Sequence, residues 1–197
     1  MVLSRSFLPI NFLIFSLLSC SNPFDTRNAE TPLSGTNNFR NLSEQEDILH
    51  NLINSFKEKK SKFYTEVFDS SLVFRPSETA NTPFFENWTL TEEDNFVNRF
   101  FSDGETLNST LNLDTLNVEY QNFSTETAQI KFEYEINFEH FYGSQDSINT
   151  FKGYSEFSIK RKNDVWKVVD WLDRPTLSAK ETWTNLKFIV LNNEADR

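Results

Sequence analysis

The feature that most constrains the fold is a strict alternation of apolar and polar residues over residues 128–138. Because successive side chains of a strand point to opposite faces, this pattern predicts a long strand with one buried face. Segments of similar character lie at 116–120, 151–160 and 165–172. Turn segments at 143–146 and 162–164 separate the later strands, so we expect an antiparallel meander that has one apolar and one polar face.

Helical patterns precede these strands. Ser43 and Glu46 have the spacing of a capping box, and an apolar stripe with helical spacing follows over 48–56. A second, shorter helix is expected over 61–68. A third is expected to begin at Thr91 and to carry the apolar residues Phe96, Val97, Phe100 and Phe101.

The connections between these helices are less regular. Residues 72–75 predict a short strand that ends at Pro76, and residues 77–88 predict a loop. Residues 181–191 are apolar but mixed in period, and we assign them to no element. Because the helices are the available cover for the apolar face of the sheet, the fold class is α+β, with helices packed on a curved antiparallel sheet.

Composition excludes several classes of function. The chain has 197 residues and a formal net charge of −10, which makes nucleic acid a poor partner. One Cys and two His leave little for a metal site, and we expect no metal and no cofactor. With 4 Gly in the whole chain there is no glycine-rich phosphate loop. The 21 Phe residues are enough to build a core.

The N-terminus has the layout of an export signal. Residues 7–18 are mostly apolar, and the stretch is too short to cross a bilayer, which needs about 20 residues. It ends in Leu-Leu-Ser-Cys at 17–20, which resembles the lipobox of bacterial lipoproteins and holds the single Cys of the chain. We therefore expect a signal peptide over 1–19 and lipidation of Cys20, although a buried or incidental Cys after an ordinary signal peptide is the alternative.

The lipoprotein interpretation sets the domain organisation. Residues 20–42 have little periodicity and predict a flexible tether, and residues 43–191 form the folded domain. Two or three acyl chains on one Cys hold a protein firmly without spanning the membrane. We expect the protein in the bacterial cell envelope, in the periplasm or at the cell surface.

The order of elements carries a resemblance to a known superfamily. A helix over 48–56 leads into Lys-Phe-Tyr at 62–64 and the segment 68–74, and the last long strand contains the run Trp166 to Asp173. This arrangement resembles the NTF2-like superfamily, which includes ketosteroid isomerase and SnoaL-type proteins, and in particular its bacterial lipoproteins. The resemblance implies a cone-shaped domain with a pocket in its open mouth. Other α+β sandwiches and a lipocalin-like barrel remain as alternatives.

The resemblance to ketosteroid isomerase implies a carboxylate base and tyrosine or acid donors inside an apolar cavity. The catalytic candidates are His140, Asp170 and Asp173. The candidates for lining the pocket are Tyr134, His140, Tyr154, Phe84, Phe85 and Trp88. Each has a structural alternative. The histidine is hydrogen-bonded or solvated, the aspartates are structural, and the three aromatic residues at 84–88 close over the core.

Three functions follow for such a domain. The first is non-catalytic binding of a small hydrophobic ligand or of a protein partner in the envelope. The second is acid–base enzyme activity of an isomerase or dehydratase. The third is an assembly role, in which the outer face of the sheet forms a homodimer or docks to an envelope complex.

Overall fold

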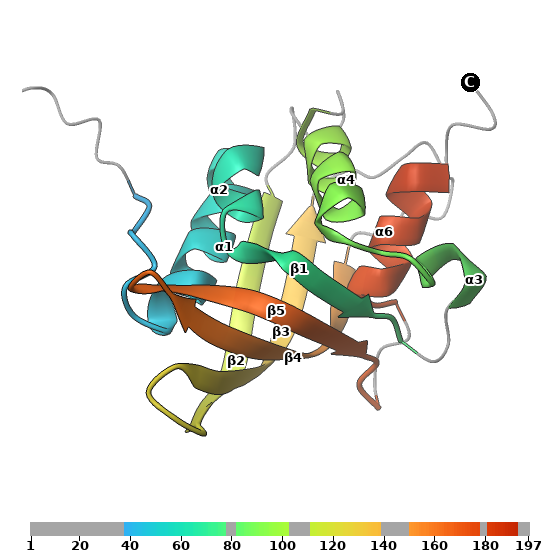
Figure 1. The fold of residues 1–197 in the computed structure, drawn as a ribbon. Coiled ribbons are helices and arrows are strands. Elements are labelled where there is room, and N and C mark those ends of the chain that lie inside the picture. The colour runs from blue at the N-terminus through green and yellow to red at the C-terminus, as the bar shows by residue number, and fades with distance from the viewer. Residues whose placement is uncertain (1–37, 78–81, 103–110, 139–149, 178–180, 193–197) are drawn as a thin grey trace, which may run out of the picture. The chain divides into compact units, whose positions relative to one another are not determined.

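A computed structural model describes residues 38–77, 82–102, 111–138, 150–177 and 181–192 (Figure 1). A five-stranded curved sheet, in the order β1-β5-β4-β3-β2, is covered on one face by helices. The strands are β1 (Phe68–Arg75), β2 (Leu111–Asn122), β3 (Thr127–Phe138), β4 (Thr150–Lys162) and β5 (Val165–Arg174). The helices are α1 (Glu46–Glu58), α2 (Ser61–Thr65), α3 (Thr82–Phe85), α4 (Leu90–Ser102) and α6 (Trp183–Asn192). The predicted α+β class, with helices packed on a curved sheet, is confirmed.

The long strands form the predicted meander. β2, β3, β4 and β5 pair antiparallel with one another in sequence order. Along β3, Ile130, Phe132, Tyr134 and Ile136 are all buried, whereas the residues between them are partly exposed. The turn between β4 and β5 contains Asn163 and Asp164, both with positive φ, as a tight hairpin turn requires.

The first strand differs from its prediction. β1 begins at Phe68, four residues earlier than expected, and it contains a register shift between Phe68 and Val73. It pairs parallel with β5, so the first and last strands of the chain are neighbours. Nothing in the local pattern of residues 68–75 indicates this partner, because parallel pairing brings together residues that are far apart in the sequence.

Two helix starts also differ from their predictions. Thr89, and not Thr91, caps α4, because the Thr89 backbone N–H donates to Glu92 Oε2 at 2.8 Å, as in a capping box. Ser43 and Glu46 do not form a capping box. The carboxylate of Asp47 instead accepts the backbone N–H of Glu44 at 3.0 Å, and α1 begins at Glu46.

Residues 38–42, which belong to the expected tether, lie against the domain. The Arg40 backbone N–H donates to Asn51 Oδ1 of α1 at 2.8 Å. The Trp166 backbone N–H of β5 donates to the Leu42 carbonyl at 2.8 Å, and the Leu42 side chain is buried.

The unassigned C-terminal segment forms α6. Its buried residues are Trp183, Thr184, Leu186, Lys187 and Val190, and they enter the core between α4, β1 and β5. None of the described helices has the length and the apolar character that crossing a bilayer requires.

Candidate functional site

The structure brings two of the predicted site residues together. The Tyr134 hydroxyl of β3 donates to Asp173 Oδ1 of β5 at 2.7 Å, and both side chains are buried. Between these strands lies Gly153 of β4, which pairs directly with Tyr134. A Cβ atom on Gly153 would lie 2.3 Å from the Tyr134 hydroxyl oxygen and 2.8 Å from the Arg174 carbonyl oxygen. The close approach of Tyr134 to Asp173 therefore requires glycine at 153.

The same pair holds the N-terminus of α6. The Trp183 backbone N–H donates to the Tyr134 hydroxyl oxygen at 2.6 Å. The Thr184 backbone N–H and hydroxyl donate to Asp173 Oδ2 at 2.8 and 2.6 Å. The first turn of a helix has backbone N–H groups without intrahelical partners, and an acidic side chain is favourable there. Tyr134 and Asp173 thus fix the position at which α6 enters the core.

Burial governs the protonation of this pair. Burial raises the pKa of Asp173, while the hydrogen bonds from Thr184 and Tyr134 oppose that shift. Burial and the nearby Asp173 carboxylate also raise the pKa of Tyr134 well above its ordinary value. Tyrosine therefore stays the donor, and the Tyr134–Asp173 bond is a stable hydrogen bond within the core.

A second buried carboxylate lies deeper among the helices. Glu93 of α4 is 0 % exposed and accepts three hydrogen bonds. The Tyr64 hydroxyl donates to its Oε1 at 2.5 Å, and the Trp88 indole N–H and Lys187 Nζ donate to its Oε2 at 2.7 and 2.6 Å. The Lys187 side chain is also 0 % exposed, so the pair is a fully buried ion pair.

Aromatic rings enclose the Lys187 ammonium group. Its Nζ atom lies 3.5 Å from the ring centroid of Phe74 and 3.6 Å from that of Trp171. The rings of Trp88 and Phe96 follow at 5.2 and 5.9 Å. Burial lowers the pKa of Lys187 to about 8, although the Glu93 carboxylate opposes the shift. Burial and the Glu93 charge raise the pKa of Tyr64 well above its ordinary value.

Glu93 and Lys187 were not predicted as site residues, although the sequence carries a signal for both. Glu93 precedes Phe96, Val97 and Phe100 by three, four and seven residues, which places it in the apolar stripe of α4. Lys187 occupies the same kind of position in α6, four residues after Trp183 and three before Val190. Two opposite charges, each at a core-facing position of a different helix, are the pattern that predicts a buried pair.

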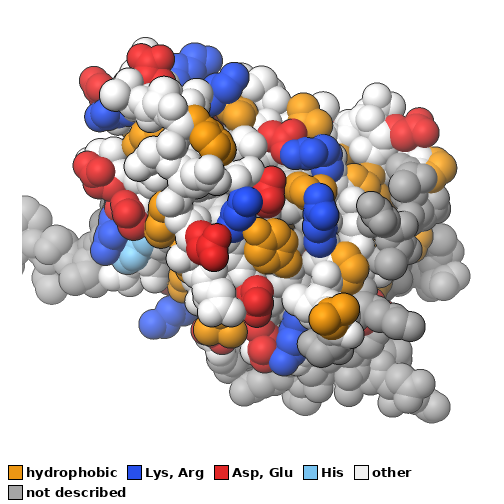
Figure 2. Space-filling model, turned by 90° about the horizontal axis from the view of Figure 1, so that it is seen from below, with side chains coloured by type: hydrophobic (Ala, Val, Ile, Leu, Met, Phe, Trp, Pro, Cys, Tyr) orange, Lys and Arg blue, Asp and Glu red, His pale blue; other side chains and the backbone are white. Residues whose placement is uncertain are grey.

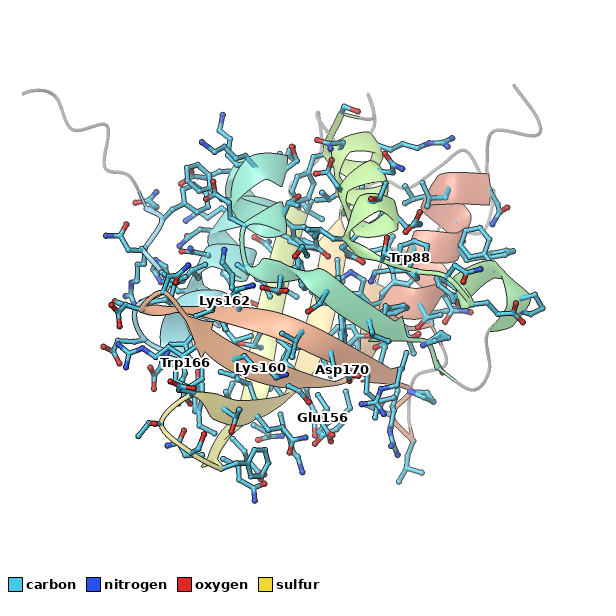
Figure 3. The ribbon with its side chains drawn as sticks, viewed as in Figure 1. Trp88, Glu156, Lys160, Lys162, Trp166 and Asp170 are labelled. Carbon is cyan, nitrogen blue, oxygen red and sulfur yellow. The ribbon has the colours of Figure 1, made fainter. Side chains whose placement is uncertain are left out.

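The remaining candidates are dispersed. Asp170 lies on the outer face of the sheet and pairs with Arg75, so it is not in the interior (Figure 3). Tyr154 was expected to face inward, but it alternates with the buried residues Gly153 and Ser155 and lies on the outer face. His140 and Cys20 lie outside the described residues, so they remain predictions.

The aromatic residues at 84–88 close over the core. Phe85 and Trp88 are 2 % and 4 % exposed and pack against Phe74 of β1, while Phe84 is partly exposed and contacts Phe188 of α6. Figure 3 shows Trp88 on the helical side of the sheet. Of the two alternatives for this cluster, the structure favours the structural one.

The described surface contains two clefts of about 500 Å³ each. One lies where the outer face of β3 and β4 meets the segment after β5. Its lining includes Leu116, Tyr134, Lys152, Tyr154, Pro175 and Leu177. The other lies between α2 and α4, and both polar and apolar residues line it, among them Lys62, Thr65, Asp94, Phe68 and Leu90.

The outer face of the sheet carries mixed charge. Figure 2 shows acidic and basic side chains interspersed around separate hydrophobic ones on this side of the molecule. Lys152 pairs with Glu135 at 2.6 Å, and Lys131 approaches Glu156 to 3.8 Å. Among the residues that the structure describes, no three His, Cys, Asp or Glu side chains gather as a metal site would require.

No protein-family model matches the chain, and no curated protein matches it. Several solved structures match the chain. The beta subunit of benzoate 1,2-dioxygenase from Burkholderia mallei aligns with a TM-score of 0.54 and 14% identity over 68% of this chain and 92% of that one. A candidate scytalone dehydratase from Novosphingobium aromaticivorans aligns with a TM-score of 0.53 and 8% identity over 70% of this chain and 89% of that one.

An NTF2-like protein of unknown function from Shewanella oneidensis also matches, with a TM-score of 0.49 and 12% identity over 66% of this chain and 94% of that one. At such low identities the likeness concerns the backbone, and it carries no residue roles. The curved sheet, its covering helices and the two neighbours with TM-scores of 0.54 and 0.53 together show the α+β fold that the resemblance predicted, the NTF2-like fold.

Proposed function

We propose that the protein is a bacterial lipoprotein, held at an envelope membrane through Cys20, whose NTF2-like domain is non-catalytic and binds an envelope protein at its outer surface. The observation that carries the proposal is the structural role of Tyr134 and Asp173, which hold the N-terminus of α6. Both groups are buried, and their hydrogen bonds go to each other and to the first turn of α6, so their polar atoms are used within the core. Proton transfer to a bound molecule needs a group within hydrogen-bond reach of that molecule.

The fold is compatible with several roles, so the site has to decide between them. One structural neighbour is the beta subunit of a dioxygenase, and this precedent of an NTF2-like subunit supports a binding role. Another bears the name of a dehydratase, which supports the enzyme alternative. We favour binding because Tyr134 and Asp173, the candidate acid–base pair, are buried and hold α6 in place.

A small hydrophobic ligand is the second candidate occupant. The cleft of about 500 Å³ beside Tyr154 favours it, because Leu116, Pro175 and Leu177 give this cleft apolar walls. Exposed apolar side chains at a rim are typical of binding sites.

The anchor is tested by cell fractionation. Cys20→Ala should move the protein from the membrane fraction to the soluble fraction, because the acyl chains are its proposed attachment. Ser19→Ala, which keeps the Cys, is the matched control. An unchanged distribution of Cys20→Ala would dispose of the anchor.

Binding at the outer surface is tested by photo-crosslinking in cells. A photoreactive amino acid at Leu177, which is fully exposed beside the cleft, should give one defined protein adduct. The same amino acid at Phe123, which is 60% exposed on the hairpin between β2 and β3, is the control for random collisions. Equal adducts at both positions would contradict a specific surface, and a small-molecule mass in native mass spectrometry would favour the ligand alternative.

The absence of catalysis is tested by complementation. In a deletion strain, each of the variants Asp173→Asn and Tyr134→Phe should restore function in proportion to the amount of folded protein that it yields. Full loss of function at a normal level of folded protein would establish a chemical role for the pair.

A further inference from the structure

The interior of the domain contains a second site, distinct from the surface proposed above. We propose that the space between Phe74, Trp171 and Glu93 is a binding site for a primary ammonium group, and that Lys187 occupies it as a ligand built into the chain. Three observations support this: the chemistry of the walls, their origin in β1, β5 and α4, and the complete burial of the occupant.

The carboxylate supplies the directional contact. Glu93 receives the Tyr64 hydroxyl on Oε1 and the Trp88 indole N–H on Oε2, and both donors belong to parts of the chain outside α6. Lys187 Nζ adds the third hydrogen bond, at 2.6 Å to Oε2. A carboxylate has about four acceptor positions, so Glu93 keeps an open position for an N–H donor when Lys187 is absent. A charge-assisted bond of this kind is stronger than a neutral one.

Two aromatic rings, those of Phe74 and Trp171, form the other neighbours of the ammonium group. Lys187 Nζ lies 3.5 and 3.6 Å from the ring centroids of Phe74 and Trp171. The faces of aromatic rings attract a cation within about 6 Å, and most strongly where water is excluded. The ammonium group therefore has one carboxylate and two ring faces as neighbours, which replace the water it loses on burial.

The walls come from elements other than α6, and Trp171 also meets Trp183 of α6 edge to face at 4.8 Å. Phe74 belongs to β1, Trp171 to β5 and Glu93 to α4. The Trp171 indole N–H donates to Ser155 Oγ of β4 at 3.1 Å, and the Phe74 and Trp171 rings meet edge to face at 5.0 Å. Removal of the Lys187 side chain therefore leaves a formed cavity with a carboxylate at one end.

The site discriminates between kinds of amine. The 2.6 Å contact to Glu93 requires an N–H donor, which a quaternary ammonium ion lacks. The buried space that the Lys187 stem fills is that of an unbranched alkyl chain. The chemical class of the ligand is accordingly a primary alkylammonium ion. In the intact chain Lys187 fills the site from within.

The test is chemical rescue of Lys187→Ala in the whole chain, purified in detergent at pH 7. The atoms that this substitution removes correspond to n-propylammonium. We expect millimolar n-propylammonium to raise the thermal midpoint of Lys187→Ala by several degrees in a saturable way and to leave the wild type unchanged. Tetramethylammonium and 1-propanol at the same concentrations should raise neither. If Lys187→Ala does not fold alone, the same series is added during refolding, and recovery of the circular dichroism spectrum is the readout.

The carboxylate is tested in the same assay. Glu93→Gln in the Lys187→Ala background keeps the size of the side chain and removes its charge, so rescue by n-propylammonium should weaken at least tenfold. Equal rescue by 1-propanol would overturn the proposal, because it would show an apolar cavity without preference for a cation. Undiminished rescue in the Glu93→Gln background, or no rescue in either assay, would overturn it as well.

Discussion

Two buried carboxylates hold α6, and they do so in different ways. Asp173 accepts hydrogen bonds from neutral donors, among them the Tyr134 hydroxyl and the backbone N–H and hydroxyl of Thr184. Glu93 accepts two neutral donors and one ammonium group, from Lys187. Both are 0 % exposed. The comparison shows that a buried carboxylate can be satisfied either by the end of a helix or by a counter-charge from the middle of the same helix.

The two solutions differ in what happens when a partner is lost. At Asp173 the loss of one donor leaves several other hydrogen bonds in place. At Glu93 the loss of the carboxylate leaves a cation buried among rings. Breaking a buried ion pair on one side costs more than weakening a neutral hydrogen-bond cluster.

Glu93→Leu should lower the free energy of unfolding by about 3–5 kcal/mol, because Lys187 then has no acceptor in the core. Urea denaturation measures the change. The double variant Glu93→Leu/Lys187→Met should be more stable than Glu93→Leu alone, since it removes both charges. A double variant with the summed loss of its two parents would show that the charges do not interact.

The stability of the wild type relative to Lys187→Met should increase with pH in the alkaline range. Unfolded Lys187 holds its proton up to about pH 10.5, whereas burial lowers the folded pKa to about 8. Between these values the unfolded chain binds more protons, so the folded state gains roughly 3 kcal/mol as the pH rises. The charged or titratable groups near Lys187 are Glu93, Asp173 and Tyr64.

The measurement is urea denaturation of both proteins from pH 7 to 10.5. The difference between the two removes the titration of groups that they share. A constant difference across this range would contradict the lowered pKa of Lys187.

Tyr134→Phe should lower the free energy of unfolding by about 1–3 kcal/mol, because it removes the donor to Asp173 and the acceptor of the Trp183 N–H. Tyr120→Phe is the matched control, since Tyr120 is 39% exposed. Thermal or urea denaturation measures both. A loss as large as that of Glu93→Leu would erase the contrast between the two carboxylates.

Arg75→Ala should change the free energy of unfolding by less than about 1 kcal/mol. Arg75 pairs with Asp170 on the outer face, where solvent screens the charges. This variant is the reference for a small loss in the free energy of unfolding, against which the losses at the two buried carboxylates are compared. A loss comparable to that of Tyr134→Phe would mean that the outer pair is more important to the fold than its exposure indicates.

The sequence predicted the parts of the fold that depend on local pattern. The period-two alternation of residues 128–138 is local, and it correctly predicted β3 and its neighbours in the meander. The pairing of β1 with β5 depends on residues far apart in the sequence, and no local pattern contains it. No element was predicted over 181–191 because the apolar residues there are mixed in period. In the structure Lys187 takes a buried position of α6 that an apolar residue would ordinarily fill.

The site was predicted only in part. Tyr134 and Asp173 were both selected as candidates, and the structure places them 2.7 Å apart. Their shared role as the anchor of α6 could not be predicted, because the position of α6 was not known. Glu93 and Lys187 lie 94 positions apart in the chain, and only the folded core brings them into contact.

The pairing of β1 with β5 also has a consequence for how the molecule reaches its native state. Phe68 of β1 is the register partner of Val168, so 100 positions separate the two ends of this ladder. Pairings of such high contact order fold slowly, because closing a long loop costs chain entropy before any contact is gained. During synthesis β1 cannot pair with β5 until β5 has left the ribosome. The closing of β1 on β5 is therefore a late step in the formation of the sheet.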